Sequence, residues 1–132
     1  MPGKMKVVLV DDSLVIRKRL AARIAGIPGI ELSGEAGSVA QALVLIRDCK
    51  PEVVVVDIRL EGGNGLALLR RVKQEAVVPV VIMLTNFPSI RTRQACSKLG
   101  SDFFFDKATE FEQALEVLAC IGSRGVPGSR RS

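Results

Sequence analysis

The chain of 132 residues is long enough for one domain with a single core, and 48% of it is hydrophobic. It contains no His, which excludes a Ser-His-Asp or Cys-His catalytic centre within this chain and removes the commonest neutral-pH base. The net charge of +5 is spread along the sequence with no nucleic-acid-binding motif beside it, so we expect no direct binding to nucleic acid.

Apolar runs of strand length alternate along the chain with segments of helical period. In chain order, the pattern predicts strand Lys6–Val10, helix Ser13–Gly26, strand Ile30–Ala36, helix Ser38–Cys49, strand Val53–Asp57, helix Gly65–Glu75, strand Val80–Leu84, helix Ser89–Leu99, strand Ser101–Phe105 and helix Thr109–Ile121. Repeated strand–helix units with right-handed crossovers predict one α/β domain, a doubly wound, flavodoxin-like (βα)5 fold. The expected order of its parallel strands is 2-1-3-4-5.

The predicted fourth helix has the thinnest apolar face of the set. Its apolar positions, Ile90, Ala95 and Leu99, are set among arginine and lysine residues. A helix that buries little apolar surface is expected to be held loosely.

The remaining features concern the cysteines, the ends of the chain and its location. Cys49, Cys96 and Cys120 are far apart and lack CxxC spacing, which predicts buried, reduced thiols. There is no secretory signal and no apolar stretch long enough to span a bilayer, so we expect a soluble, cytoplasmic protein. The domain is expected to cover residues 1–122, followed by a disordered basic tail over Ser123–Ser132.

Polar residues stand where four of the predicted strands end. Asp11 and Asp12 follow the first strand, Asp57 ends the third, Thr85 follows the fourth and Lys107 comes just after the fifth. Ligands of parallel α/β sheets bind beyond the carboxyl ends of the strands, and in the expected order the first and third strands are neighbours. We therefore expect the three carboxylates to converge in one pocket.

Such a pocket has a definite chemistry. Three carboxylates repel one another unless a cation joins them, and Mg²⁺ takes oxygen ligands. An aspartate can attack phosphorus to form an aspartyl phosphate, while a lysine and a threonine hydroxyl can contact the phosphoryl oxygens. The sequence supplies one candidate for each role, in Asp57, Lys107 and Thr85.

These residues resemble the receiver domain of two-component response regulators, including the chemotaxis regulators. The resemblance runs from Lys6 to about Ile121 and rests on Val10-Asp11-Asp12-Ser13, the segment Asp57–Gly65, Thr85 and Lys107. It implies a signalling switch, either stand-alone or part of a longer protein, whose Asp57 is phosphorylated by a histidine kinase or phosphotransfer protein.

The same resemblance implies roles for the other residues. Asp12 and Asp57 would bind Mg²⁺, with Asp11 helping through water and Arg59 through its backbone carbonyl. Lys107 would contact the phosphoryl group, and Thr85 with Phe104 would form the conformational switch. Charge added at Asp57 should draw Thr85 toward it, let Phe104 rotate inward and shift the thinly packed fourth helix. We therefore expect a downstream protein partner to bind the fourth helix, fifth strand and fifth helix, through residues such as Arg91, Arg93, Lys98 and the exposed side of Glu112–Glu116.

Three positions depart from the usual pattern of this family, and the first is Glu61, where a proline is frequent. Ala108 follows Lys107 where a proline after a cis peptide is usual, and Phe104 replaces the commoner tyrosine. Arg59 and Phe87 are expected to flank the path of a hydrolytic water without orienting it, which predicts a long-lived phosphorylated form.

Two other functions remain as alternatives. A Mg²⁺-dependent phosphatase with an aspartyl-phosphate intermediate usually needs a second acid near the nucleophile, but Arg59 stands two residues after Asp57. A flavin-binding module of the same topology would need a phosphate-cradling loop after the first strand, and none is present. We expect no enzyme activity beyond self-phosphorylation from phosphodonors and self-dephosphorylation.

Overall fold

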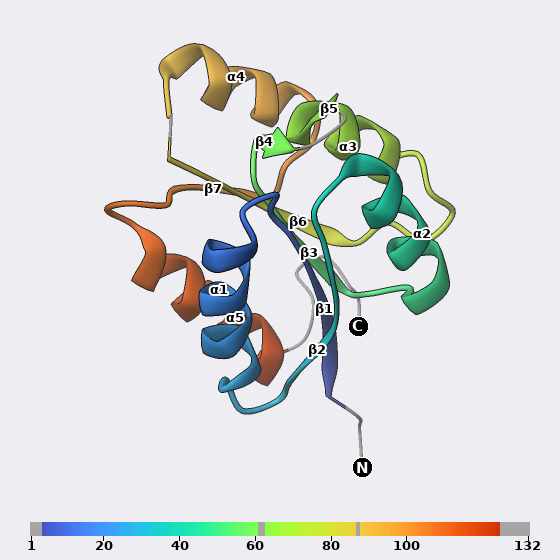
Figure 1. Ribbon diagram of the computed structural model, residues 1–132, viewed down its shortest axis with the longest axis vertical. Coiled ribbons are helices and arrows are strands. Elements are labelled where there is room, and N and C mark those ends of the chain that lie inside the picture. The colour runs from blue at the N-terminus through green and yellow to red at the C-terminus, as the bar shows by residue number, and fades with distance from the viewer. Residues whose placement is uncertain (1–3, 61–62, 87, 125–132) are drawn as a thin grey trace.

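A parallel sheet divides the molecule into two helical layers in the computed structural model, which describes residues 4–60, 63–86 and 88–124 (Figure 1). The sheet has five strands in the order β2-β1-β3-β6-β7. They are β1 (Met5–Val10), β2 (Ile30–Ala36), β3 (Val53–Val56), β6 (Val80–Thr85) and β7 (Phe103–Asp106). Because β6 and β7 are the fourth and fifth strands of this sheet, the predicted α/β fold and its 2-1-3-4-5 order are confirmed.

An additional two-stranded sheet was not predicted. The short strands β4 (Arg59–Leu60) and β5 (Gly63–Asn64) pair antiparallel directly after the end of β3. Here the Gly65 N–H also donates to the carbonyl oxygen of Ile58 over 2.6 Å. These bonds hold the segment after Asp57 close to the sheet.

The described residues form helices α1 (Leu14–Ala25), α2 (Val39–Cys49), α3 (Gly65–Val72), α4 (Ile90–Lys98) and α5 (Phe111–Arg124). Side chains of Ser13, Ser38, Asn64 and Ser89 accept backbone hydrogen bonds at the starts of the first four. α3 ends before the predicted Glu75, whereas α5 continues past the predicted Ile121 as far as Arg124. Ser123 and Arg124 of the expected disordered tail are thus helical. Residues 125–132 lie outside the described residues, so for them the tail remains a prediction.

Alternate residues of the strands face the two helical layers, as the pleat of a strand requires. On β1, Val7 and Leu9 contribute to the core beneath α1 and α5, while Val8 and Val10 contribute to the core beneath α2, α3 and α4. Helix α4 contributes one fully buried residue, Cys96. This helix thus has little apolar contact with the core, as expected, but of its three predicted apolar positions Ile90 is 77% exposed and Ala95 and Leu99 are only half-buried.

The cysteines differ from one another in burial. Cys96 is buried, and burial raises the pKa of its thiol to about 11, so it stays protonated at neutral pH. Cys49 is half-buried and Cys120 is exposed on α5, and all three are free of disulfide bonds. The prediction of three buried thiols is thus wrong for Cys120, because its position lies on the solvent side of α5.

None of the described helices is long and apolar enough to cross a membrane.

Gly65 provides a test of how tightly the segment after β3 is packed. A Cβ atom at this buried position would overlap the backbone carbonyl oxygen of Asp57. Gly65→Ala should therefore lower the free energy of unfolding by about 1–3 kcal/mol, because backbone must move to make room. Gly26→Ala is the control, since a Cβ at Gly26 would meet its nearest atoms at 3.6 Å. Equal urea midpoints for the two variants would contradict this packing.

Candidate functional site

The carboxyl ends of β1 and β3 place the acidic residues side by side. Asp11 follows β1, and its N–H donates to the carbonyl oxygen of Ala36 on β2 over 3.0 Å. Asp57 follows β3, and its N–H donates to the carbonyl oxygen of Val10 over 2.9 Å. The sheet pairing thus continues to the edge of the site, which fixes the backbone from which both carboxylates project.

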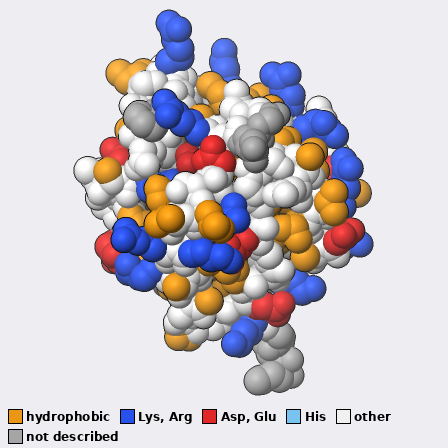
Figure 2. Space-filling view, viewed as in Figure 1, with side chains coloured by type: hydrophobic (Ala, Val, Ile, Leu, Met, Phe, Trp, Pro, Cys, Tyr) orange, Lys and Arg blue, Asp and Glu red, His pale blue; other side chains and the backbone are white. Residues whose placement is uncertain are grey.

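The three carboxylates form a cluster. Oxygen atoms of Asp11, Asp12 and Asp57 all lie within 4.8 Å of one another. Asp11 is buried, Asp57 is half-buried and Asp12 is exposed. In Figure 2, acidic side chains gather where the surface covers the end of β1. The predicted convergence of these carboxylates is observed, and their oxygens are of the kind that Mg²⁺ binds.

Lys107 enters this cluster from the end of β7. Its backbone N–H donates to the carbonyl oxygen of Thr85 over 2.7 Å. Its Nζ lies 2.6 Å from Oδ2 of Asp11 and 3.0 Å from Oδ2 of Asp57. The side chain of Lys107 is 8% exposed, that of Asp11 is 2% exposed and that of Asp57 is 12% exposed. The ion pairs are therefore largely shielded from water.

Burial dominates the electrostatics of Asp57. It raises the pKa of the Asp57 carboxyl above its usual range, and the neighbouring Asp11 carboxylate acts in the same direction. The ammonium of Lys107 and a backbone hydrogen bond from Arg59 oppose this rise in pKa without cancelling it. The ammonium therefore does not fully offset the burial of Asp57 and the charge of Asp11, and a further cation would favour the ionised form of Asp57.

The two predicted switch residues lie beside the acidic cluster on the next strands. Thr85 is buried at the end of β6, and Phe104 pairs with Met83 across β6 and β7. Strand alternation puts Thr85, Met83 and Phe104 on the sheet face covered by α4. The guanidinium carbon of Arg93, on α4, lies 4.4 Å from the centre of the Phe104 ring. Thus one end of α4 contacts the predicted switch directly.

Other predicted features have mixed outcomes. The Lys107–Ala108 peptide is trans, since the described residues contain no cis peptide bond. Phe87, expected to flank the path of water, lies outside the described residues.

The sequence did not reveal the role of Arg17, whose Nη1 donates to the backbone carbonyl of Asp11 over 2.9 Å. The position of Arg17, four residues after the Ser13 cap, could have indicated this contact, because side chains on a helix lean toward its N-terminal turn.

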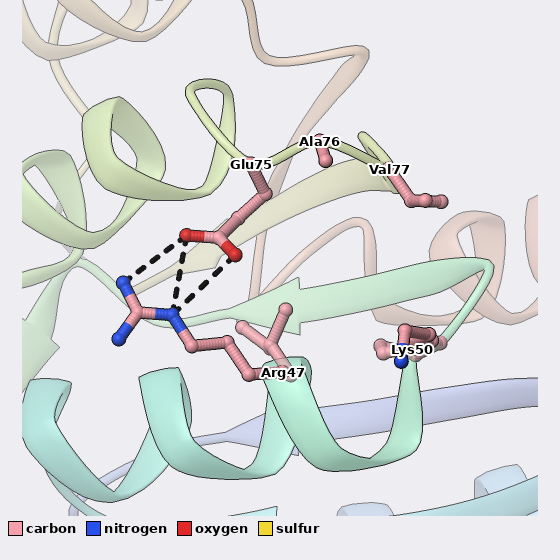
Figure 3. A pocket seen from close by; sticks show the side chains of 7 residues that line it. Arg47, Lys50, Glu75, Ala76 and Val77 are labelled. Atoms are coloured by element: carbon pink, nitrogen blue, oxygen red, sulfur yellow. Dashed lines mark hydrogen bonds and ion pairs between the residues drawn. The ribbon is translucent and has the colours of Figure 1, made fainter.

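A separate pocket lies at the amino end of the sheet, between the end of α2 and the segment after α3. It has a volume of about 200 Å³, and its lining includes Pro51, Ala76 and Val77. Arg47 and Glu75 pair across it, with Arg47 Nη2 3.2 Å from a Glu75 carboxylate oxygen (Figure 3). The charged groups of its lining are this pair and Lys50, so it holds a single carboxylate and nothing comparable to the acidic cluster.

Comparisons with known proteins agree with this geometry. The chain matches the response regulator receiver domain family over residues 7–119. It is 31% identical to a protein-glutamate methylesterase/protein-glutamine glutaminase of Alkalilimnicola ehrlichii, over 96% of this chain and 35% of that protein. It is 38% identical to the DNA-binding transcriptional activator DevR/DosR of Mycobacterium tuberculosis, over 64% of this chain and 39% of that protein. The chain thus spans little more than a third of these curated relatives.

Solved structures give the same result for the fold. The receiver domain of NarL from Mycobacterium tuberculosis has a TM-score of 0.80 at 25% identity, covering 94% of this chain and 99% of that chain. The response regulator domain of Thermotoga maritima CheB has a TM-score of 0.81 at 22% identity, covering 96% and 99%. The chain therefore belongs to the response regulator receiver family, the phosphorylation-activated switches of two-component signalling.

Proposed function

We propose that this chain accepts a phosphoryl group on Asp57 from a histidine kinase or phosphotransfer protein, in a reaction that requires Mg²⁺. The observation that carries the proposal is the contact of Lys107 Nζ with both Asp11 and Asp57 inside the carboxylate cluster. This arrangement places a nucleophilic oxygen beside a cation that can bind phosphoryl oxygens. It also leaves negative charge in excess, which suits a divalent ion.

The residues fit the proposed metal. Asp12 and Asp57 would hold Mg²⁺, with Asp11 acting through water and Arg59 through its backbone carbonyl. All these donors are oxygens, and Asp12 is exposed, so an ion can reach the cluster from solvent. Once bound, Mg²⁺ would neutralise charge on the phosphoryl oxygens.

The chemistry of the protein residues follows from their positions. A carboxylate oxygen of Asp57 attacks phosphorus, the new O–P bond forms, and the P–N bond to the donor imidazole breaks. The electron pair of that bond leaves with the imidazole. Lys107 stays within reach of Asp57 through its ammonium and stabilises the added phosphoryl charge.

The kinase or phosphotransfer partner would bind beside α1. Leu14 and Val15, in the first turn of α1, are 58% and 68% exposed although both are apolar. A neighbouring groove of about 520 Å³ extends between α1 and α5, and Lys107 is part of its lining. A partner that covers Leu14 and Val15 would thus bring its phosphohistidine close to Asp57.

The response would travel through Thr85 and Phe104 to α4. Phosphorylation adds nearly two negative charges and three acceptor oxygens at Asp57, toward which the Thr85 hydroxyl can turn. That movement would free space on the α4 side of the sheet, where Phe104 can rotate inward. Because α4 buries only Cys96 fully, its position should shift with little cost. The downstream protein partner would then bind the surface of α4, β7 and α5.

We propose no reaction on a separate substrate for this chain. The methylesterase named among the relatives is much longer than the region that matches here. Arg59 is exposed at the position where a phosphatase would carry its second acid, which disfavours that alternative. A flavin-binding module is disfavoured by the family match. Localisation in the cytoplasm remains a prediction from the sequence.

Phosphorylation is tested by replacing the acceptor. Wild-type protein incubated with acetyl phosphate and Mg²⁺ should gain one phosphoryl group in an intact-mass spectrum, and Asp57→Asn should gain none. Asp48→Asn is the matched control, because Asp48 is an exposed aspartate on α2 and should leave labelling unchanged. Stoichiometric labelling of Asp57→Asn at Asp11 or Asp12 would refute the assignment.

The switch is tested by separating labelling from the distant response. Thr85→Ala should keep phosphorylation but lose the chemical-shift changes that beryllofluoride causes at Phe104 and along α4. Thr109→Ala, an exposed threonine just after the site, should behave as wild type. If beryllofluoride shifts stay at the acidic cluster even in wild type, the proposed path to α4 is wrong.

A further inference from the structure

Arg17 connects the first turns of α1 to the backbone of the acidic pair. Its Nη1 donates to the carbonyl oxygen of Asp11 over 2.9 Å, and its Nε lies 3.3 Å from Oε1 of Glu35 on β2. The Arg17 and Glu35 side chains are only 18% and 22% exposed. Lys18 Nζ lies 3.4 Å from the same oxygen of Glu35, but its own side chain is 65% exposed. The buried contact with Asp11 is thus made by Arg17.

The surrounding chain leaves room for this guanidinium. A Cβ atom at Gly37, just after β2, would come within 2.8 Å of Arg17 Nη1. Arg17 also lies one helical turn beyond the Ser13 cap, so its side chain leans back over the end of β1. Both the helix geometry and the small residue after β2 therefore direct Arg17 toward Asp11.

The consequence of the contact lies in the peptide plane that joins Asp11 to Asp12. The Asp11 carbonyl and the Asp12 nitrogen belong to one rigid plane, so fixing the carbonyl also fixes the direction in which Asp12 leaves the strand. The other groups of Asp11 are held as well. Its N–H donates to Ala36, and its Oδ1 accepts from the Ser13 N–H over 2.9 Å. Arg17 supplies the remaining restraint on this turn.

We propose that Arg17 is a positioning residue for the metal site, because its contact with the Asp11 carbonyl directs the carboxylate of Asp12 toward the ion. Glu35 in turn holds the guanidinium in place. This inference rests on the proposed Mg²⁺ site at Asp11, Asp12 and Asp57. It adds a residue that contacts neither the metal nor the phosphoryl group, and whose role is to restrain the backbone of the ligands.

Charge and positioning make opposite predictions for Arg17. A cation near a metal site repels the ion, so if charge were its main effect, Arg17→Met would strengthen Mg²⁺ binding. If positioning is its role, the same change should weaken Mg²⁺ binding about tenfold, as loss of a supporting contact does at other metal sites. Arg17→Lys keeps the charge, but an ammonium lacks the planar set of donors with which a guanidinium contacts Asp11 and Glu35 at once. This variant should therefore also weaken Mg²⁺ binding.

The experiment is a calorimetric Mg²⁺ titration of the full chain and its variants. Arg17→Met and Arg17→Lys should raise the Kd, whereas the rate of labelling by acetyl phosphate at saturating Mg²⁺ should stay near the wild-type rate. Arg23→Met is the matched control, because Arg23 lies on the same helix and pairs instead with Glu112 over 2.9 Å. It should leave the Kd unchanged. Glu35→Gln should raise the Kd by a smaller factor while Arg17 remains present.

The outcomes separate the inference from the function on which it rests. Unchanged or tighter Mg²⁺ binding by folded Arg17→Met and Arg17→Lys would overturn the positioning role while leaving the metal site intact. An equal loss in Arg23→Met would also overturn it, since the effect would then be general to the helix. Wild-type protein that binds no Mg²⁺ would overturn the metal site and the inference together. Should Arg17→Met not fold, Arg17→Lys and Glu35→Gln decide the question.

Discussion

The ammonium of Lys107, held between the carboxylates of Asp11 and Asp57, is the interaction on which the rest of the site depends. It joins the carboxyl ends of β1, β3 and β7, which are far apart in the sequence. Two carboxylates share one ammonium in a region nearly closed to water, and a third carboxylate lies within 4.8 Å. The remaining negative charge is what makes a divalent cation the natural partner of this pocket.

This charge arrangement also gives a reason for the proposed path of the response from Asp57 to α4. A phosphoryl group on Asp57 would add negative charge next to Thr85, which lies at the end of β6. Of the helices around the sheet, α4 has a single fully buried residue, while Arg93 on it contacts the Phe104 ring. The helix with the least buried surface is therefore the one that contacts Phe104, one of the two proposed switch residues. A small change in packing there can move a surface without disturbing the main core.

The sequence was sufficient for the fold and for the acidic cluster because both follow from strand positions. Continuous apolar runs identified the central strands, and their order placed Asp11 and Asp57 together without any knowledge of side-chain contacts. The same reasoning could not detect the β4–β5 pair, which has two residues per strand and no periodic signal. It also missed the contact of Arg17 with Asp11, because an arginine on a helix is usually solvated. Cys120 shows the converse error, since a residue type that is often buried lies here on an exposed face.

The most direct test of the account is the pKa of the Asp57 carboxyl, measured from its ¹³C chemical shift during a pH titration. With a chelator present, the pKa should lie above the usual aspartate value, because burial and Asp11 outweigh Lys107. Addition of Mg²⁺ should lower that pKa, since the ion binds the ionised carboxylate. The same titration of Lys107→Met should give a still higher pKa without metal. An ordinary pKa that responds to neither Mg²⁺ nor the loss of Lys107 would contradict the central claim.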